Sequence, residues 1–116
     1  MKKLTVIMLS LAMSIIAGSA MAKGNQLLDQ THFEKGIKCA SCHGNAQPRE
    51  AVTMMKCVQC HNTEKLAKKT KDMQPTNVHN NRHFGTESNC LSCHHVHQTS
   101  ENACVSCHPR WGFKVP

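Results

Sequence analysis

The sequence is poor in the large side chains that fill the core of an ordinary globular protein. Its 116 residues include no tyrosine, one tryptophan and three phenylalanines, so aromatic residues make up 3% of the chain. It has no Gly-x-Gly-x-x-Gly motif, which argues against FAD binding through such a motif. A chain of this length allows a single domain, and something other than side chains must fill its interior.

Residues 1–22 have the three parts of a secretory signal peptide. Lys2 and Lys3 form a positive start, residues 4–17 are apolar, and Ala20-Met21-Ala22 is a small-x-small cleavage site. We expect export to the periplasm, cleavage after Ala22 and a mature domain over residues 23–116 without stable membrane insertion. The alternative is an uncleaved anchor, because the segment is nearly long enough to span a bilayer.

All eight cysteines fall into four copies of one pattern. The copies are Cys39-Ala-Ser-Cys42-His43, Cys57-Val-Gln-Cys60-His61, Cys90-Leu-Ser-Cys93-His94 and Cys104-Val-Ser-Cys107-His108. Cys-x-x-Cys-His is the attachment motif of c-type haem. Two thiols three positions apart can each add to a vinyl group of one porphyrin, and the adjacent histidine is directed at the iron. We therefore predict four covalently bound haem c groups, with His43, His61, His94 and His108 as proximal ligands.

Three other uses of paired cysteines compete with this interpretation. A disulfide framework is common in exported chains, but it gives no reason for a histidine after every second cysteine. Zinc sites built from Cys-x-x-Cys pairs would leave those histidines unused. A thioredoxin-like redox site needs one motif on an α/β scaffold, and the sequence has no βαβ pattern.

The basic charge of the sequence does not indicate a nucleic-acid or membrane surface. The formal net charge is +7, and it falls to +5 when Lys2 and Lys3 leave with the signal peptide. Because each haem carries two propionates, four ferric haems add about −4 and four ferrous haems about −8. The assembled protein is then close to neutral when oxidised and acidic when reduced.

Five histidines lie outside the motifs, and four haems need at most four distal ligands. Methionine is the other common axial ligand, but residues 23–116 contain only three methionines, so four bis-histidine haems are the economical assignment. His95 adjoins His94 and lacks the slack to reach another iron, so we expect it to face solvent or a propionate. The predicted distal ligands are His32, His79, His83 and His97. With every axial site filled, the protein should conduct electrons rather than catalyse a reaction.

The sequence predicts a mostly irregular fold with short α-helices and little or no β structure, wrapped around four haems. The linkers between motifs have 13, 28 and 9 residues, so the motifs form two pairs joined by a bridge. Short helical turns should carry each motif, and the bridge contains one predicted helix, residues 62–73, ended by Pro75.

Two surface segments each allow two interpretations. The bridge lysines form either a solvated face or a docking patch for an acidic partner; they are Lys65, Lys68, Lys69 and Lys71. The tail, residues 109–116, holds Trp111 and Phe113 and either packs over a haem edge or contacts a partner protein.

The order of motifs and extra histidines resembles the small tetrahaem cytochrome c family. The resemblance covers a His-Phe-Glu at residues 32–34, all four motifs, His97 and the segment Asn77-Val-His79-Asn-Asn-Arg-His83-Phe84-Gly85. It is strongest to the tetrahaem domain of periplasmic flavocytochrome c fumarate reductases. It implies bis-histidine ligation through His32, His79, His83 and His97. The interval between His79 and His83 is one residue longer than in that domain, so the resemblance does not assign these two histidines to particular haems.

The resemblance implies an electron-transfer protein of anaerobic respiration and leaves its partners open. Because this sequence has no flavin domain, we expect it to serve a separate flavoprotein reductase of the fumarate-reductase type as its cytochrome subunit. The alternative is a free shuttle between a membrane-anchored quinol-oxidising cytochrome and several periplasmic reductases. A third possibility is a haem enzyme with one open iron site, which would require one distal histidine to be unbound.

Overall fold

The structure is a computed structural model, and it describes residues 26–116. The predicted signal peptide and the expected start of the mature domain at Lys23 lie outside the described residues. Among the described residues, no helix is both long enough and apolar enough to cross a membrane.

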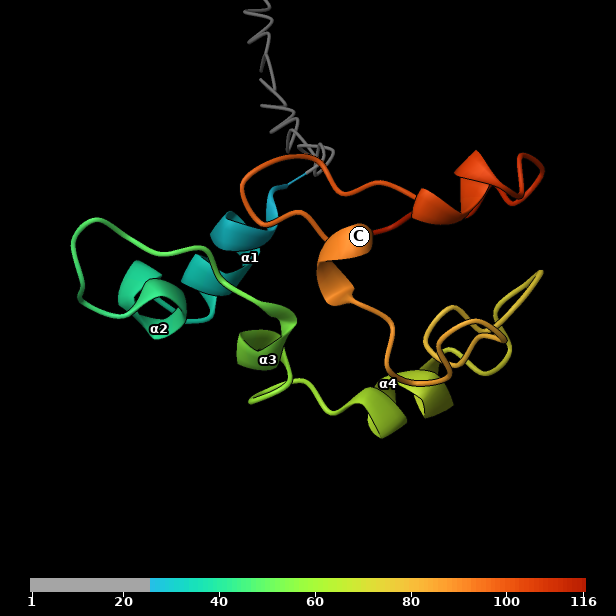
Figure 1. Cartoon of the computed structure of the whole chain (residues 1–116), viewed down its shortest axis with the longest axis horizontal. Helices are drawn as coiled ribbons and strands as arrows, with labels where there is room; N and C mark the ends of the chain where they lie inside the picture. Colours follow the sequence, from blue (N-terminus) through green and yellow to red (C-terminus); the bar gives the residue numbers. More distant parts are fainter. Residues whose placement is uncertain (1–25) are drawn as a thin grey trace, which may run out of the picture.

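Short helices separated by irregular chain make up the fold (Figure 1). In chain order the elements are α1 (Leu28–Glu34), α2 (Cys39–His43), α3 (Met54–Cys57), α4 (Thr63–Lys69) and the 3-10 helices η1 (Cys90–Ser92) and η2 (Ala103–Ser106). Residues 26–116 contain no β-strand, and their β structure is limited to an isolated antiparallel bridge between Asn81 and Gly85. The predicted fold class is therefore confirmed.

The chain follows a curved, open path that brings its ends back toward its middle. In Figure 1, α1 and α2 lie together, α3 and α4 follow, and the C-terminus returns to the orange turn of η1. Pro116 there lies near His94. The last four residues also line a pocket with Gln26, Leu28 and Thr31 at the start of the described chain. Segments far apart in the sequence therefore meet.

Side-chain packing contributes little to this fold. Ala67 is the single buried residue in the described part of the chain. Several large apolar side chains are exposed: Phe33, Ile37, Met55, Phe84 and Val105. Helices of seven residues or fewer are marginal in water without packing partners. The scarcity of aromatic residues predicted this lack of a side-chain core.

Asparagine caps define three of the helical turns. The side-chain oxygens of Asn62, Asn89 and Asn102 accept hydrogen bonds from backbone N–H groups at the starts of α4, η1 and η2. Such a cap is worth about 1 kcal/mol. Asn89 and Asn102 thereby fix the turns in which the third and fourth motifs begin.

Helix α4 is shorter than the sequence predicted. It starts after Asn62 as expected, but it ends at Lys69 rather than at Met73. The Asn77 side-chain amide donates to the Ala67 carbonyl at 2.8 Å and so takes the acceptor that the N–H of Lys71 would need in a longer helix. The predicted 62–73 helix was therefore wrong in its last turn, because a loop residue competes for the helix carbonyl.

Helix α1 was not predicted from the sequence. Its seven residues are too few to show a clear apolar period. The backbone N–H of Asp29 donates to the Val96 carbonyl at 3.0 Å, which holds the first turn of α1 against residues 96–97. This tertiary contact involves residues far apart in the sequence, and it places His32 on an ordered element.

Candidate functional site

Each Cys-x-x-Cys-His motif folds into one helical turn. The N–H groups of His61, His94 and His108 donate to the carbonyl of the first cysteine in their own motifs at 2.9, 2.8 and 2.8 Å. The first motif forms α2. Such a turn places the histidine one turn beyond the first cysteine, on the same side. The predicted short turns at the motifs are confirmed.

Each motif histidine faces one histidine from another part of the chain. The ring centroids are 6.0 Å apart for His43 and His97, 6.0 Å for His61 and His32, 6.3 Å for His94 and His79, and 6.2 Å for His108 and His83. The four partners are the histidines predicted as distal ligands, and no partner is shared. The structure therefore brings the eight predicted histidines together in four pairs.

This spacing fits two imidazoles bound to opposite sides of one iron. A ring nitrogen lies about 2 Å from a bound metal, and it lies about 1.2 Å from the centre of a five-membered ring with bonds of about 1.35 Å. Two such rings on one metal have centres about 6.3 Å apart. Because a Cys-x-x-Cys pair adjoins one member of each histidine pair, the donor set also fits a covalently attached porphyrin.

Hydrogen bonds occupy the second ring nitrogen, Nδ1, of four of these histidines. His32 pairs with the Leu28 carbonyl at 2.6 Å and His43 with the Glu50 carbonyl at 2.9 Å. A carbonyl can only accept, so Nδ1 carries the proton in both rings. The lone pair is then on Nε2, which is the tautomer that can bind a metal while its second nitrogen is held.

A carboxylate takes the same role at His97. Its Nδ1 lies 3.1 Å from Oδ2 of Asp29. This hydrogen bond lowers the pKa of the Asp29 carboxyl. A metal-bound histidine commonly donates its second N–H to such an acceptor.

His79 is held by a neutral network at the end of α4. The Thr70 hydroxyl donates to Oδ1 of Asn77 at 2.7 Å, and its oxygen lies 3.2 Å from Nδ1 of His79. The same Asn77 oxygen accepts the backbone N–H of His79 at 3.1 Å. Both the backbone and the ring of His79 are therefore fixed by two uncharged side chains.

Burial favours the neutral form of the His79–His94 pair. Burial lowers the pKa of both rings, and the neighbouring His79 lowers the pKa of His94 further. The two rings are nearly parallel, with an angle of 9° between their planes. A neutral imidazole is the form that binds iron, because a protonated ring has no free lone pair.

Asparagine turns position two of the partner histidines, a feature that sequence reasoning missed. Oδ1 of Asn81 accepts the N–H groups of His83 and Phe84 at 2.9 and 3.0 Å, just as Asn77 accepts from His79. Asparagine hydrogen-bonded to the backbone two residues on is a common turn. The repeated Asn-x-His at residues 77–79 and 81–83 was the available signal.

Neighbouring motifs approach one another through their cysteines. Burial and the adjacent Cys90 raise the pKa of the Cys57 thiol, and burial and the adjacent Cys93 raise that of Cys104. Helix α3 also contacts η1 directly. The second and third motifs are therefore close in space although the longest linker separates them.

His95 takes no part in the four pairs. Its Nε2 lies 3.9 Å from Oε1 of Glu101, and its backbone N–H donates to the Ser100 hydroxyl at 3.3 Å. The side chain is 20% exposed, which argues against the solvent-facing half of the expectation for His95 and leaves a propionate contact as a prediction. Glu101 provides a local partner that the sequence argument did not consider.

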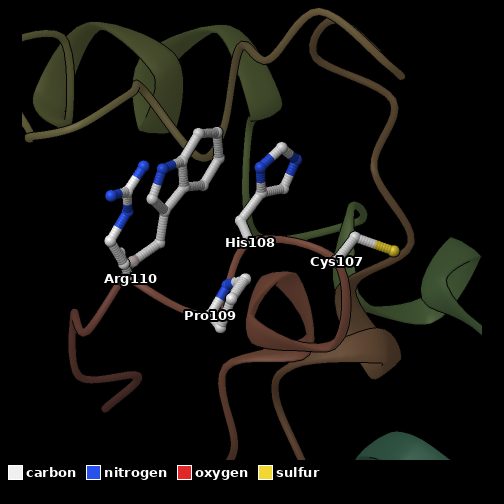
Figure 2. A pocket seen from close by; sticks show the side chains of 5 residues that line it. Cys107, His108, Pro109 and Arg110 are labelled. Atoms are coloured by element: carbon white, nitrogen blue, oxygen red, sulfur yellow. The ribbon is translucent and has the colours of Figure 1, made fainter.

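The C-terminal tail packs against the fourth motif. The indole of Trp111 stacks on the His108 ring, with centroids 3.9 Å apart and an angle of 8° between the planes. Figure 2 shows His108 and Cys107 with Arg110 around the same pocket. Trp111 covers one face of the predicted proximal ligand, and both interpretations of the tail, packing over a haem edge and contact with a partner protein, stay predictions.

The described residues show neither the disulfides nor the ligand clusters that the other uses of paired cysteines would need. No disulfide joins any two of the eight cysteines. Within the described range, no three side chains of His, Cys, Asp or Glu gather closely enough to hold one metal ion. A disulfide framework or a tetrahedral zinc site would need one of these arrangements.

Comparisons with known proteins agree with this arrangement. The sequence model of the cytochrome c3 family matches residues 31–109, a range that holds all four motifs and their partner histidines. The acrylate reductase cytochrome subunit of Shewanella woodyi (strain ATCC 51908 / MS32) is 29% identical over 107 residues, which cover 87% of this chain and 91% of that protein. No solved structure matches the chain. The chain belongs to the cytochrome c3 family, and it is therefore a multihaem electron-transfer protein with covalently bound haem c rather than an enzyme in its own right.

Proposed function

We propose that this chain is a periplasmic tetrahaem cytochrome that delivers electrons to a separate flavoprotein reductase as its cytochrome subunit. A bound c-type haem supplies reversible one-electron Fe(III)/Fe(II) chemistry. The four Cys-x-x-Cys pairs tether the porphyrins, and the paired histidines hold each iron from both sides.

The axial pairs follow the histidine pairs in motif order. They are His43 with His97, His61 with His32, His94 with His79, and His108 with His83. One observation carries this proposal: every motif histidine has its own partner ring at 6.0–6.3 Å, the distance that two ligands of one metal require. Because protein side chains fill both axial positions, they exclude small molecules from the iron and favour electron transfer over substrate binding.

The closeness of neighbouring motifs supports passage of electrons along the chain. Helix α3 ends at Cys57 and contacts η1, which begins at Cys90, so the attachment points of the second and third porphyrins lie near each other. Electron tunnelling falls steeply with distance. Attachment points this close favour transfer between the second and third sites.

The proposed partner is a flavoprotein that reduces α,β-unsaturated carboxylates. The name of the Shewanella woodyi relative links it to acrylate reductase, and the resemblance drawn from the motifs points to fumarate reductases. Acrylate and fumarate are both α,β-unsaturated carboxylates. The exposed lysines of α4 offer a basic face that suits an acidic partner surface; they are Lys65, Lys68 and Lys69. A membrane-anchored quinol-oxidising cytochrome is the proposed electron donor.

Purification of the native protein from the periplasm under mild conditions tests this proposal. We expect a chain of residues 23–116 with the added mass of four haems, a fully low-spin spectrum and a larger flavin-containing chain that elutes with it. Carbon monoxide should leave the spectrum unchanged. A matched variant, Cys57→Ala with Cys60→Ala, should lose the mass of one haem.

The outcomes separate the alternatives. A protein that carries four haems and elutes alone favours the free shuttle between the membrane cytochrome and several reductases. A haem count other than four contradicts the assignment of the motifs. Rapid binding of carbon monoxide by the native protein contradicts the filled axial sites.

A further inference from the structure

His97 differs from the other predicted ligands in the charge of its hydrogen-bond partner. Its Nδ1 pairs with a carboxylate, whereas those of His32, His43 and His79 pair with two carbonyls and a hydroxyl. We propose that Asp29 is a positioning residue that selectively lowers the reduction potential of the iron held by His43 and His97. This inference rests on the axial pairs proposed above.

The Asp29 carboxylate is fixed on both oxygens. Oδ2 lies 3.1 Å from Nδ1 of His97, and Oδ1 accepts the N–H of Gln30 at 2.7 Å. The backbone N–H of Asp29 donates to the Val96 carbonyl at 3.0 Å. Side chain and backbone therefore both hold α1 against the segment that carries His97, so the hydrogen bond does not depend on one flexible contact.

The charge of Asp29 is not offset by a neighbouring cation. In the described part of the chain, its ion-pair partner is His97, and the other pairs are Lys71 with Asp72 and His95 with Glu101. The Asp29 side chain is 38% exposed, so water screens its field only in part. A net negative charge therefore remains beside one ligand ring.

A carboxylate on the second nitrogen makes the imidazole a stronger electron donor to its metal. Stronger donation stabilises Fe(III) more than Fe(II), and it therefore lowers the reduction potential. A carbonyl or hydroxyl acceptor has the same direction of effect but carries no net charge. The Asp29 carboxylate should therefore favour Fe(III) at the site of the first motif.

Reduction potentials of the holoprotein test this inference. Asp29→Asn keeps the shape of the side chain and removes its charge, and Asp29→Ser is a second neutral variant that a helix start tolerates. Asp29→Glu restores the charge. The matched control is Asp72→Asn, because Asp72 has the same charge, is 84% exposed and pairs with Lys71 at 3.0 Å.

We expect both neutral variants to raise one of the four reduction potentials by at least about 59 mV, which corresponds to a tenfold change in the equilibrium constant of a one-electron reduction. Asp29→Glu should return most of this shift, and Asp72→Asn should move all four potentials much less. The haem whose potential rises must be the one whose low-spin signal is lost in His97→Ala. A merely structural role would change haem content or unfolding without a selective rise in one potential.

The inference is overturned if both neutral variants shift the four potentials equally, or shift none of them more than Asp72→Asn does. In that case four intact low-spin haems would still support the proposed function. A native protein with fewer than four haems, or with a high-spin haem, would instead remove the proposed axial pairs, and the inference about Asp29 with them.

Discussion

The His79–His94 pair and the His43–His97 pair reach similar geometry by different means. Their rings are nearly parallel, at 9° and 16°, with centroids 6.3 and 6.0 Å apart. Burial and the neutral Thr70–Asn77 network hold the first pair. In the second pair the His97 side chain is 64% exposed and is held by a carboxylate from α1. The same ligand geometry can therefore come from a local turn or from a distant charged contact.

Removal of a ligand from either pair should have the largest effect. His79→Ala and His97→Ala should each convert one haem to a high-spin form that binds carbon monoxide, because each variant opens one axial position. Optical and electron paramagnetic resonance spectra measure this change. His95→Ala is the control and should leave four low-spin haems. A high-spin haem in His95→Ala with none in His97→Ala would reverse the ligand assignment.

Disruption of the asparagine network should destabilise the His79 side alone. Asn77→Ala removes a donor to the Ala67 carbonyl and an acceptor for Thr70 and His79. We expect the free energy of unfolding to fall by about 1–3 kcal/mol, measured by guanidinium unfolding of the holoprotein. Asn80 is exposed, so Asn80→Ala should change it by about 0.5 kcal/mol or less. Equal losses in the two variants would show that the network does not stabilise this region.

Removal of the neutral acceptor at His79 should shift a reduction potential by less than removal of the charge at Asp29 does. Thr70→Val keeps the side-chain shape but leaves Nδ1 of His79 without its hydroxyl partner. The potential of the haem that His79 holds should rise, because the ring becomes a weaker donor. The same redox titration measures both shifts. A larger shift in Thr70→Val than in Asp29→Asn would show that acceptor charge does not govern the difference between the pairs.

Salt should have the smallest effect of these changes on the difference in reduction potential between the two sites. The Debye length falls from about 30 Å at 0.01 M salt to about 3 Å at 1 M. Because Asp29 is part-exposed and the His79 network is uncharged, salt should raise the potential at the His43–His97 site more than at the His79–His94 site. Redox titrations at the two salt concentrations measure this. Parallel changes at both sites would argue against a contribution from the Asp29 charge.

The motifs and their turns could be predicted from sequence because covalent attachment to one porphyrin fixes the spacing of the residues. The four histidines that lie opposite the motif histidines are the ones predicted as distal ligands, and their role as iron ligands stays a prediction. Which partner meets which motif could not be predicted. The first motif meets His97 and the second meets His32, and the hydrogen bond between the Asp29 N–H and the Val96 carbonyl joins the segments that carry these two histidines.

The limits of the helices also divide into those that could be predicted from the sequence and those that could not. Asn62 is a local start signal, and the start of α4 was predicted correctly. Its end depends on Asn77, which lies ten residues beyond Ala67, so the helix was predicted too long. Helix α1 was missed because a contact with residue 96 supports it. Helix limits set by neighbouring residues could be predicted from the sequence, whereas limits set by contacts between distant residues could not.

The pairing of the first two motifs also separates a near ligand from a distant one. His32 precedes the second motif by 25 residues. His97 follows the first motif by 54 residues and lies beyond the third motif. With the proposed pairs, loss of the chain beyond the third motif would remove the second ligand of the first motif and would leave that of the second motif in place.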